Sequence, residues 1–339
     1  MQFCDVQFRT NTIRYTDRMT HGLPTLAELD AAARLIYSAF QPTPQYRWPL
    51  LETRLGTRCW VKHENHTPVG AFKVRGGLVY CDWLQRTRPE VRGVVTAPRG
   101  NHGQSIGYAS QRTGLRACVV VPVGNSVEKN AAMRALGVEL LEEGSDFQES
   151  VEAADRIAVE RGWHRLPSYD VRLVSGVGTY AMELLRAAPD VQTVYVPIGL
   201  GSGACGVIAA RDALRHQAEV VGVVSTEAPA YARSIERGEA VSVAATTRIA
   251  DGMACRTPVP AALDVLRSGL SRVVLVTDDE VEDAMRFLFA DTHNAAEGAG
   301  AAALAAAMQE RGNLRDEIAV ILCGGNVDSD TFRRVLAAH

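Results

Sequence analysis

Residues 62–77 read Lys-His-Glu-Asn-His-Thr-Pro-Val-Gly-Ala-Phe-Lys-Val-Arg-Gly-Gly. They follow a short apolar run at 58–61 that is typical of a β-strand, and they precede residues 78–84, which read as a helix. Lys73 is therefore expected after a Pro/Gly turn and close to a helix start. Only three of the 36 basic residues are lysines, namely Lys62, Lys73 and Lys129.

The scarcity of lysine makes Lys73 a candidate catalytic residue. Arginine stays charged, whereas a desolvated lysine can lose its proton, act as a nucleophile and form a Schiff base with an aldehyde. Lys73 follows Phe72 and is itself followed closely by two glycines, which suits a site of this kind. A partly buried structural lysine is the alternative interpretation, since most lysines serve no catalytic purpose.

Length and composition indicate a globular protein of two lobes. A chain of 339 residues exceeds the size at which one hydrophobic core usually keeps growing. The 47% hydrophobic and 22% charged residues are ordinary for a globular protein, and the net charge of −3 comes without a basic stripe for nucleic acid. No apolar run reaches the roughly 18 residues of a membrane span. Residues 1–22 lack the apolar core of a signal peptide, and we treat them as an N-terminal extension.

The cysteines are scattered singly, and their number is odd. A dispersed set without Cys-x-x-Cys spacing favours a reducing, cytoplasmic environment over a disulfide framework or a zinc site. The histidines also lack metal-ligand spacing, and the isolated acids Glu227 and Asp251 form only a weak candidate pair. No metal site is therefore expected. The seven cysteines are Cys4, Cys59, Cys81, Cys118, Cys205, Cys255 and Cys323.

Strands and helices alternate through most of the chain, which predicts an α/β fold with parallel sheets. Residues 92–166 form a predicted small, mobile domain, with strands at 93–97, 115–121 and 138–141 and helices at 104–112, 127–136 and 147–160. Residues 23–91 and 167–339 form the predicted large, cofactor-binding domain. Its expected strands are 191–198, 220–225, 272–276 and 318–322, and its expected helices are 23–40, 178–187, 204–215, 279–290, 295–307 and one ending at His339.

Three loops that follow predicted strands could bind a ligand, because α/β proteins bind ligands at the carboxyl ends of parallel strands. Gly199-Leu200-Gly201-Ser202-Gly203 precedes a helix, where backbone N–H groups and the helix dipole favour a phosphate, although a plain tight turn is equally compatible. In Arg99-Gly100-Asn101-His102, the side-chain amide of Asn101 can both donate a hydrogen bond to a ligand and accept one from it. The alternative interpretation is that these residues only form a turn. Cys323 precedes two glycines, where a flat ring could approach the backbone, unless it is a small core residue.

Taken together, these motifs resemble the fold-type II pyridoxal-phosphate enzymes, and within them the serine/threonine dehydratases. The resemblance covers about residues 23–335 and rests on Lys62-x-Glu64-Asn65, Gly70-Ala71-Phe72-Lys73-x-Arg75-Gly76, the loop at 99–102 and the loop at 199–203. It implies two lobes, each with a mostly parallel sheet flanked by helices, and pyridoxal 5'-phosphate bonded to Lys73. By the same resemblance, Phe72 and Asn101 lie near the cofactor ring, residues 199–203 bind its phosphate, and Cys323 faces its pyridine nitrogen.

The implied reaction is dehydration of a β-hydroxy-α-amino acid, such as threonine, serine or a β-substituted serine, to a 2-oxo acid and ammonia. Arg99, Gly100, Asn101 and His102 would bind the substrate, with Arg99 free to grip a carboxylate. Relatives that racemise serine carry a serine at the position of Arg99, which makes racemisation doubtful here. Arg233 replaces an expected aspartate of the metal pair that includes Glu227, which again predicts no metal.

The resemblance also implies a homodimer that acts on a small amino acid, whereas the charge and apolar patterns lead us to expect no nucleic-acid or membrane partner. The end of the chain at His339 leads us to expect no added regulatory domain. A β-replacement enzyme or an amino-acid racemase on the same cofactor is the first alternative, and a non-catalytic binding module is the second.

Overall fold

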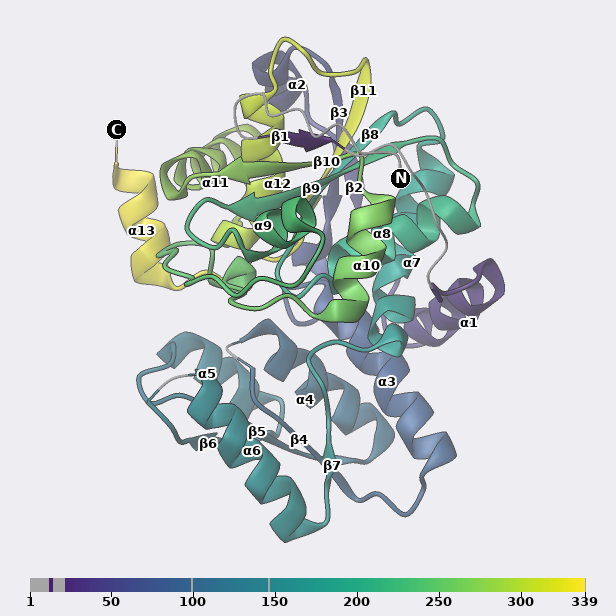
Figure 1. Ribbon diagram of the computed structural model, residues 1–339, viewed down its shortest axis with the longest axis vertical. Helices are drawn as coiled ribbons and strands as arrows, with labels where there is room; N and C mark the ends of the chain where they lie inside the picture. Colours follow the sequence, from purple (N-terminus) through teal and green to yellow (C-terminus); the bar gives the residue numbers. More distant parts are fainter. Residues whose placement is uncertain (1–11, 15–21, 99, 146, 339) are drawn as a thin grey trace.

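The computed structural model describes residues 12–14, 22–98, 100–145 and 147–338, which form two sheets with helices around each. In Figure 1 the larger sheet and its helices make the upper lobe, and the smaller sheet makes the lower lobe. Because the strands inside both sheets run parallel, the predicted α/β architecture of two lobes is confirmed.

The larger sheet has seven strands in the order β1-β10-β9-β8-β11-β3-β2. Its five inner strands are parallel, while β1 and β2 pair antiparallel at the two edges. Val320 of β11 lies between Val61 of β3 and Tyr195 of β8. Strands buried on both faces read as continuous apolar runs, which is why the sequence located most of them. The strands are β1 (Thr12–Arg14), β2 (Gln45–Arg47), β3 (Arg58–His63), β8 (Thr193–Pro197), β9 (Glu219–Ser225), β10 (Arg272–Val276) and β11 (Glu317–Leu322).

Helices cover this sheet, and the Ala-rich α12 packs against β8, β9, β10 and β11. The apolar residues of α12 are almost all buried, so it belongs to the core of the upper lobe. The helices of this lobe are α1 (Leu26–Tyr37), α2 (Pro49–Leu55), α7 (Val171–Ala187), α8 (Ser202–Ala213), α9 (Ala230–Arg237), α10 (Pro260–Gly269), α11 (Asp278–Thr292), α12 (Gly298–Gln309) and α13 (Ser329–Ala337), with short 3-10 turns η1 (Glu64–His66) and η2 (Asp251–Met253).

The smaller sheet has four parallel strands in the order β6-β5-β4-β7, all of which lie within the predicted segment 92–166. Helix α3 links the lobes, because Val74 and Leu78 share one apolar cluster with Val94 and Val119 of the small sheet. The domain boundaries and the mobility of the small domain stay predictions. The elements are α3 (Lys73–Thr87), β4 (Gly93–Thr96), α4 (Asn101–Thr113), β5 (Arg116–Val121), α5 (Val127–Ala135), β6 (Glu139–Glu142), α6 (Phe147–Arg161) and β7 (His164–Arg165).

Helix starts are where prediction and structure differ most. The capping box at Thr25 and Glu28 is confirmed, since Thr25 N donates to Glu28 Oε2 at 2.8 Å and Glu28 N donates to Thr25 Oγ1 at 3.3 Å, although α1 ends at Tyr37 instead of residue 40. By contrast, three helices begin earlier than predicted. Helix α3 begins five residues before the predicted 78, α4 three residues before 104, and α7 seven residues before 178. Helices α2, α9 and α10 and strands β1, β2 and β7 were not predicted.

Glycines explain the late predictions of α3 and α7. Gly76 and Gly176 interrupt the apolar pattern, yet they lie where the two helices cross. A Cβ added at Gly76 would lie 2.8 Å from the carbonyl oxygen of Leu173, and one at Gly176 would clash with the carbonyl of Arg75. These glycines therefore permit close helix packing and do not break the helices.

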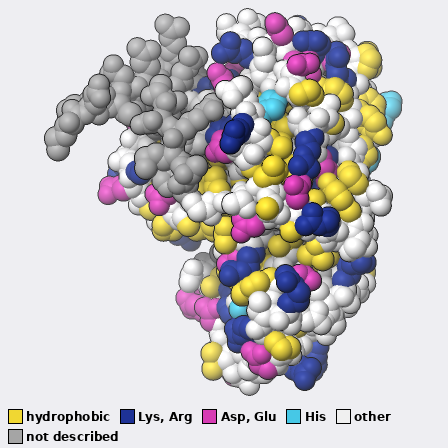
Figure 2. Space-filling model, turned by 90° about the vertical axis from the view of Figure 1, so that its right-hand side faces the viewer, with side chains coloured by type: hydrophobic (Ala, Val, Ile, Leu, Met, Phe, Trp, Pro, Cys, Tyr) yellow, Lys and Arg dark blue, Asp and Glu magenta, His cyan; other side chains and the backbone are white. Residues whose placement is uncertain are grey.

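Charged side chains of both signs are interspersed over the two lobes on the face that Figure 2 shows. This agrees with the mild net charge of −3. Within the described ranges, no helix combines the length and the apolar character that crossing a membrane requires.

Candidate active site

The candidate site is a cavity of about 630 Å³ between the two lobes. It forms where it does because β3, β8 and β11 are parallel, so the loops after His63, Pro197 and Leu322 leave the sheet at one edge. Both lobes contribute to its wall, which includes Lys73, Pro98, Gly100, Asn101, His102, Lys129, Gln148, Ser168, Gly199, Leu200, Asp251, Gly252, Arg256 and Glu297.

Lys73 is the first residue of α3, and backbone contacts with the loop after β11 hold it there. Phe72 N donates to the carbonyl oxygen of Cys323 at 3.0 Å, and Thr67 Oγ1 bonds both the N–H and the carbonyl of Ala71. Burial lowers the pKa of Lys73, against the opposing charges of Cys323, Glu297 and Asp251. Its Nζ makes no hydrogen bond within the described part of the chain, so the amine is available to a ligand.

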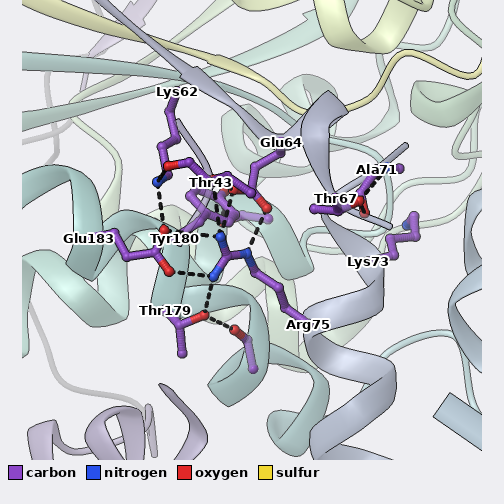
Figure 3. A network of polar contacts seen from close by, with 12 residues as sticks. Thr43, Lys62, Glu64, Thr67, Ala71, Lys73, Arg75, Thr179, Tyr180 and Glu183 are labelled. Carbon is purple, nitrogen blue, oxygen red and sulfur yellow. Dashed lines mark hydrogen bonds and ion pairs between the residues drawn. The ribbon is translucent and has the colours of Figure 1, made fainter. Parts of the chain in front are cut away.

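A buried ion network anchors the segment around Lys73. The Arg75 guanidinium donates to Glu64 at 2.7 Å and to Glu183 at 2.6 Å, and it also bonds Thr179 and Thr43. Lys62 Nζ donates to the second oxygen of Glu183 at 2.6 Å. Figure 3 shows Arg75 between the two carboxylates, with Lys73 beyond Glu64 at the start of the same helix. The Lys62, Glu64 and Arg75 positions of the sequence motif therefore form the support of the site.

Asn101 opens α4 and is held on both sides of its amide. Its Nδ2 donates to Glu297 Oε1 at 2.6 Å, and its Oδ1 accepts a hydrogen bond from Asn326 Nδ2 at 2.9 Å. Asn326 Nδ2 also donates to the carbonyl oxygen of Val69 at 2.8 Å. One N–H of Asn101 is left without a partner in the described ranges, and Asn101 lines the cavity.

Glu297 is a buried acid in the cavity wall that the sequence analysis did not single out. Burial raises its pKa to about 7, although the charge of Lys129 acts in the opposite direction. Its backbone N–H donates to the carbonyl oxygen of Gly324 at 3.1 Å, which fixes it at the start of α12. The only sequence signal was an acid near the start of the Ala-rich helix predicted at 295–307.

Lys129 also reaches the cavity, from α5 of the lower lobe. Its Nζ forms an ion pair of 2.6 Å with Asp251 of η2 in the upper lobe. Burial alone would lower the pKa of Lys129, but Asp251 and Glu297 raise it above its ordinary value. The sequence marked Lys129 only as one of three lysines and Asp251 as an isolated acid, so the pair was missed.

The glycine-rich loop joins β8 to α8 and contributes Gly199 and Leu200 to the cavity wall. Gly201 has φ +97°, which a side chain would strain, and a Cβ there would lie 2.8 Å from Ala262. Tyr231 Oη donates to the carbonyl oxygen of Leu200 at 2.9 Å and Tyr180 Oη to that of Gly203 at 3.1 Å. The first N–H groups of a helix have no acceptor within the helix, so those at the start of α8 can bind an anion.

Of the other predicted residues, two line the cavity, Phe72 and Cys323 lie outside its lining, and one is outside the described ranges. Gly100 and His102 line it, and burial lowers the pKa of His102 to about 3, so that its ring is neutral. Phe72 packs edge-to-face on Tyr180 and lies behind the loop at Gly203. Cys323 is buried, which raises the pKa of its thiol. Arg99 is not among the described residues, so its predicted contact with substrate stays a prediction.

These residues define a class of site, in which a nucleophilic amine and an anion-binding helix start share one cavity. Such a site fits a phosphorylated aldehyde cofactor: Lys73 supplies a free amine, and the buried Nε2 of His102 has no partner among the described residues. No three His, Cys, Asp or Glu side chains in the described ranges cluster closely enough to hold a metal ion.

Comparison with known proteins identifies the family. The model described as "Pyridoxal-phosphate dependent enzyme" matches residues 36–324. L-threonine ammonia-lyase of Thermotoga maritima is 31% identical over 313 residues, covering 92% of this chain and 78% of that protein. The crystal structure of a T.th. threonine deaminase has a TM-score of 0.85 at 31% identity, covering 90% of this chain and 99% of that one. A pyridoxal 5'-phosphate-dependent aspartate racemase has a TM-score of 0.86 at 28% identity, covering 93% and 99%.

The chain therefore belongs to the pyridoxal-phosphate-dependent enzyme family. The predicted fold-type II architecture, the cofactor pyridoxal 5'-phosphate and the predicted relation to the serine/threonine dehydratases are confirmed, and with them the prediction of a pyridoxal-phosphate-dependent lyase. The roles of the individual site residues stay predictions.

Proposed function

We propose that this protein is an ammonia-lyase that converts a β-hydroxy-α-amino acid, of the threonine or serine type, to a 2-oxo acid and ammonia. The observation that carries the proposal is the buried amine of Lys73, with its lowered pKa, in a cavity beside an anion-binding loop. The names of the relatives, threonine ammonia-lyase and threonine deaminase, support this substrate class.

Pyridoxal 5'-phosphate would supply an electron sink that acidifies the Cα–H bond of a bound amino acid. In the proposed arrangement, Lys73 holds the cofactor through its amine, and the N–H groups of Gly199, Leu200, Gly201, Ser202 and Gly203 bind the phosphate. Asn101 bonds the phenolic oxygen, Phe72 packs nearby, and Cys323 faces the pyridine nitrogen. Arg99, Gly100, Asn101 and His102 bind the substrate carboxylate.

Lys73 also moves the proton in this proposal. Its lowered pKa makes the neutral amine more available, and a neutral amine can accept the Cα proton at Nζ. Because burial lowers the pKa of His102, its ring is neutral and adds no positive charge to the site. The buried Cys323 thiol, whose pKa is raised, offers the pyridine nitrogen a neutral partner, which favours elimination over transamination.

Racemisation is the second candidate function, because an aspartate racemase matches this fold at 28% identity. A racemase needs a second proton-transfer group on the opposite face of the substrate. Arg99 stands where racemising relatives place a serine, and its basic guanidinium is poorly suited to exchange that proton. We therefore place elimination first.

The test is direct. Purified protein loaded with pyridoxal 5'-phosphate is assayed for 2-oxo acid and ammonia with threonine, serine, phenylserine and hydroxyaspartate of both stereochemical series. We expect release from at least one of them without an added nucleophile, and a loss of at least about 10³-fold in Lys73→Ala, because the covalent anchor and the base are both removed. Change of configuration without ammonia would instead identify a racemase. Failure to bind the cofactor would contradict both candidates.

We also propose that the protein acts as a homodimer in the cytoplasm. The dimer is proposed from the family resemblance. The cytoplasm is supported by the six described cysteines, which are all free and buried, as a reducing compartment would leave them.

A further inference from the structure

The side chains that hold Asn101 form a hydrogen-bond chain with a defined direction. The chain runs from the carbonyl oxygen of Val69 through Asn326 and Asn101 to Glu297, with donor–acceptor distances of 2.8, 2.9 and 2.6 Å. A backbone carbonyl can only accept hydrogen bonds. The Val69 end of the chain therefore determines which way each amide between Val69 and Glu297 points.

The direction follows from the Val69 end. Val69 accepts, so Asn326 turns its Nδ2 toward Val69, and the same Nδ2 donates to Asn101 Oδ1. Asn101 must then direct its own Nδ2 toward Glu297. Glu297 is 3% exposed, and its backbone N–H is bonded to Gly324. The Asn326 side chain packs directly on Gly70, since a Cβ added at Gly70 would lie 2.5 Å from Asn326 Oδ1.

We propose that Glu297 and Asn326 hold Asn101 in this one orientation, so that its free N–H faces the phenolic oxygen of bound pyridoxal phosphate, and that Glu297 is a positioning residue for the cofactor. The inference rests on the proposed function, which places that oxygen beside Asn101. A donated N–H stabilises the ionised oxygen, whereas a reversed amide would present a carbonyl and favour the neutral hydroxyl. The orientation of the Asn101 amide thus determines whether the phenolic oxygen of the cofactor is ionised or neutral.

The test uses absorbance, because the ionised and neutral forms of the bound cofactor absorb in the visible and the near-ultraviolet, respectively. Spectra are recorded for loaded wild type, Glu297→Ala and Glu297→Gln, each normalised to the cofactor released by alkali. We expect the ratio of visible to near-ultraviolet absorbance to fall several-fold in Glu297→Ala, because Asn101 is then held by Asn326 alone and its N–H is directed at the phenolic oxygen less firmly. Glu297→Gln should largely restore the ratio, since its side-chain carbonyl can accept from Asn101. Glu90→Ala, far out on the surface, is the control and should match wild type.

An unchanged ratio in Glu297→Ala at full cofactor content would overturn the inference, and so would a fall of equal size in Glu297→Gln. Should Glu297→Ala not retain the cofactor, Asn326→Leu decides, because it removes the other anchor of the same amide without touching Glu297. A normal ratio in Asn326→Leu overturns the inference, and a lowered one supports it. If wild type itself gains no visible band with added cofactor, the proposed function fails first, and that result differs from every variant-specific outcome.

Discussion

At the scale of single residues, the conformation of residues 62–77 depends on the charged side chain of Arg75. Its side chain is fully buried between Glu64 and Glu183, with Thr179 and Thr43 completing its hydrogen bonds. A buried ion pair adds little stability in itself, but removing one partner leaves an uncompensated charge in the core. Since Arg75 lies two residues after Lys73 in α3, this cost falls directly on the candidate site.

We predict that Arg75→Met lowers the free energy of unfolding by about 3–5 kcal/mol, because Glu64 and Glu183 stay buried without their partner. Urea unfolding of the cofactor-free protein measures the loss. Arg186→Met is the matched control. Arg186 lies in α7, as Glu183 does, and it pairs with Asp30, but the two side chains are 47% and 35% exposed. That variant should lose less than about 1 kcal/mol. Equal losses in the two variants would contradict the role of burial.

At the scale of elements, the crossing of α3 and α7 depends on backbone contact. Gly76 and Gly176 face each other across it, and no space remains for a methyl group at Gly176. The amino end of α3 carries Lys73, so the distance between these helices also sets the position of the amine.

We predict that Gly176→Ala destabilises the protein by about 1–3 kcal/mol through overpacking, although alanine is the better helix former by roughly 1 kcal/mol in an open position. The affinity for pyridoxal phosphate should fall as well, because α3 must shift. Thermal unfolding and cofactor titration give the two values. Ser175→Ala, one position earlier in α7, should stay within about 0.5 kcal/mol of wild type. A gain of stability in Gly176→Ala would show that a methyl group fits between α3 and α7, which would contradict the prediction.

At the scale of the whole molecule, one side of α5 ties the lower lobe to the upper one. Lys129 pairs with Asp251, Ser126 Oγ donates to Asp328 at 2.6 Å, and the backbone N–H of Ser329 donates to Glu128 at 2.9 Å. These three contacts lie between the lobes, and Lys129 and Asp251 also line the cavity. Opening of the lobes would break them together, which makes them candidates for stabilising the closed form.

We predict that Lys129→Met raises KM for the amino-acid substrate several-fold, because it removes a contact that holds the two lobes together beside the cavity. The free energy of unfolding should change less, because Asp251 is 43% exposed and can be solvated when unpaired. Steady-state kinetics and urea unfolding separate the two effects. Arg134→Met is the control on the same helix, since Arg134 pairs with Glu142 inside the lower lobe. An equal rise of KM in both variants would rule out a specific role for the contact between lobes.

The sequence by itself determined the features that local signals carry. Buried parallel strands such as β5 and β11 are continuous apolar runs, and Lys73 is one of only three lysines among 36 basic residues. The glycine loop at 199–203 follows a strand and opens a helix, so its position needed no tertiary information. Each of these signals lies within a few neighbouring residues, which is the range over which side-chain period and backbone preference act.

Only the tertiary structure decided which polar groups meet at the site. Asn101 and Glu297 are 196 residues apart, Asn326 and Asn101 are 225 apart, and Lys129 and Asp251 are 122 apart. A hydrogen bond or ion pair between such groups leaves no periodic trace in the sequence, because the partners are brought together by strand order and not by spacing. For the same reason, the predicted helix at 178–187 left out Gly176, whose close neighbour across the helix crossing only the fold reveals.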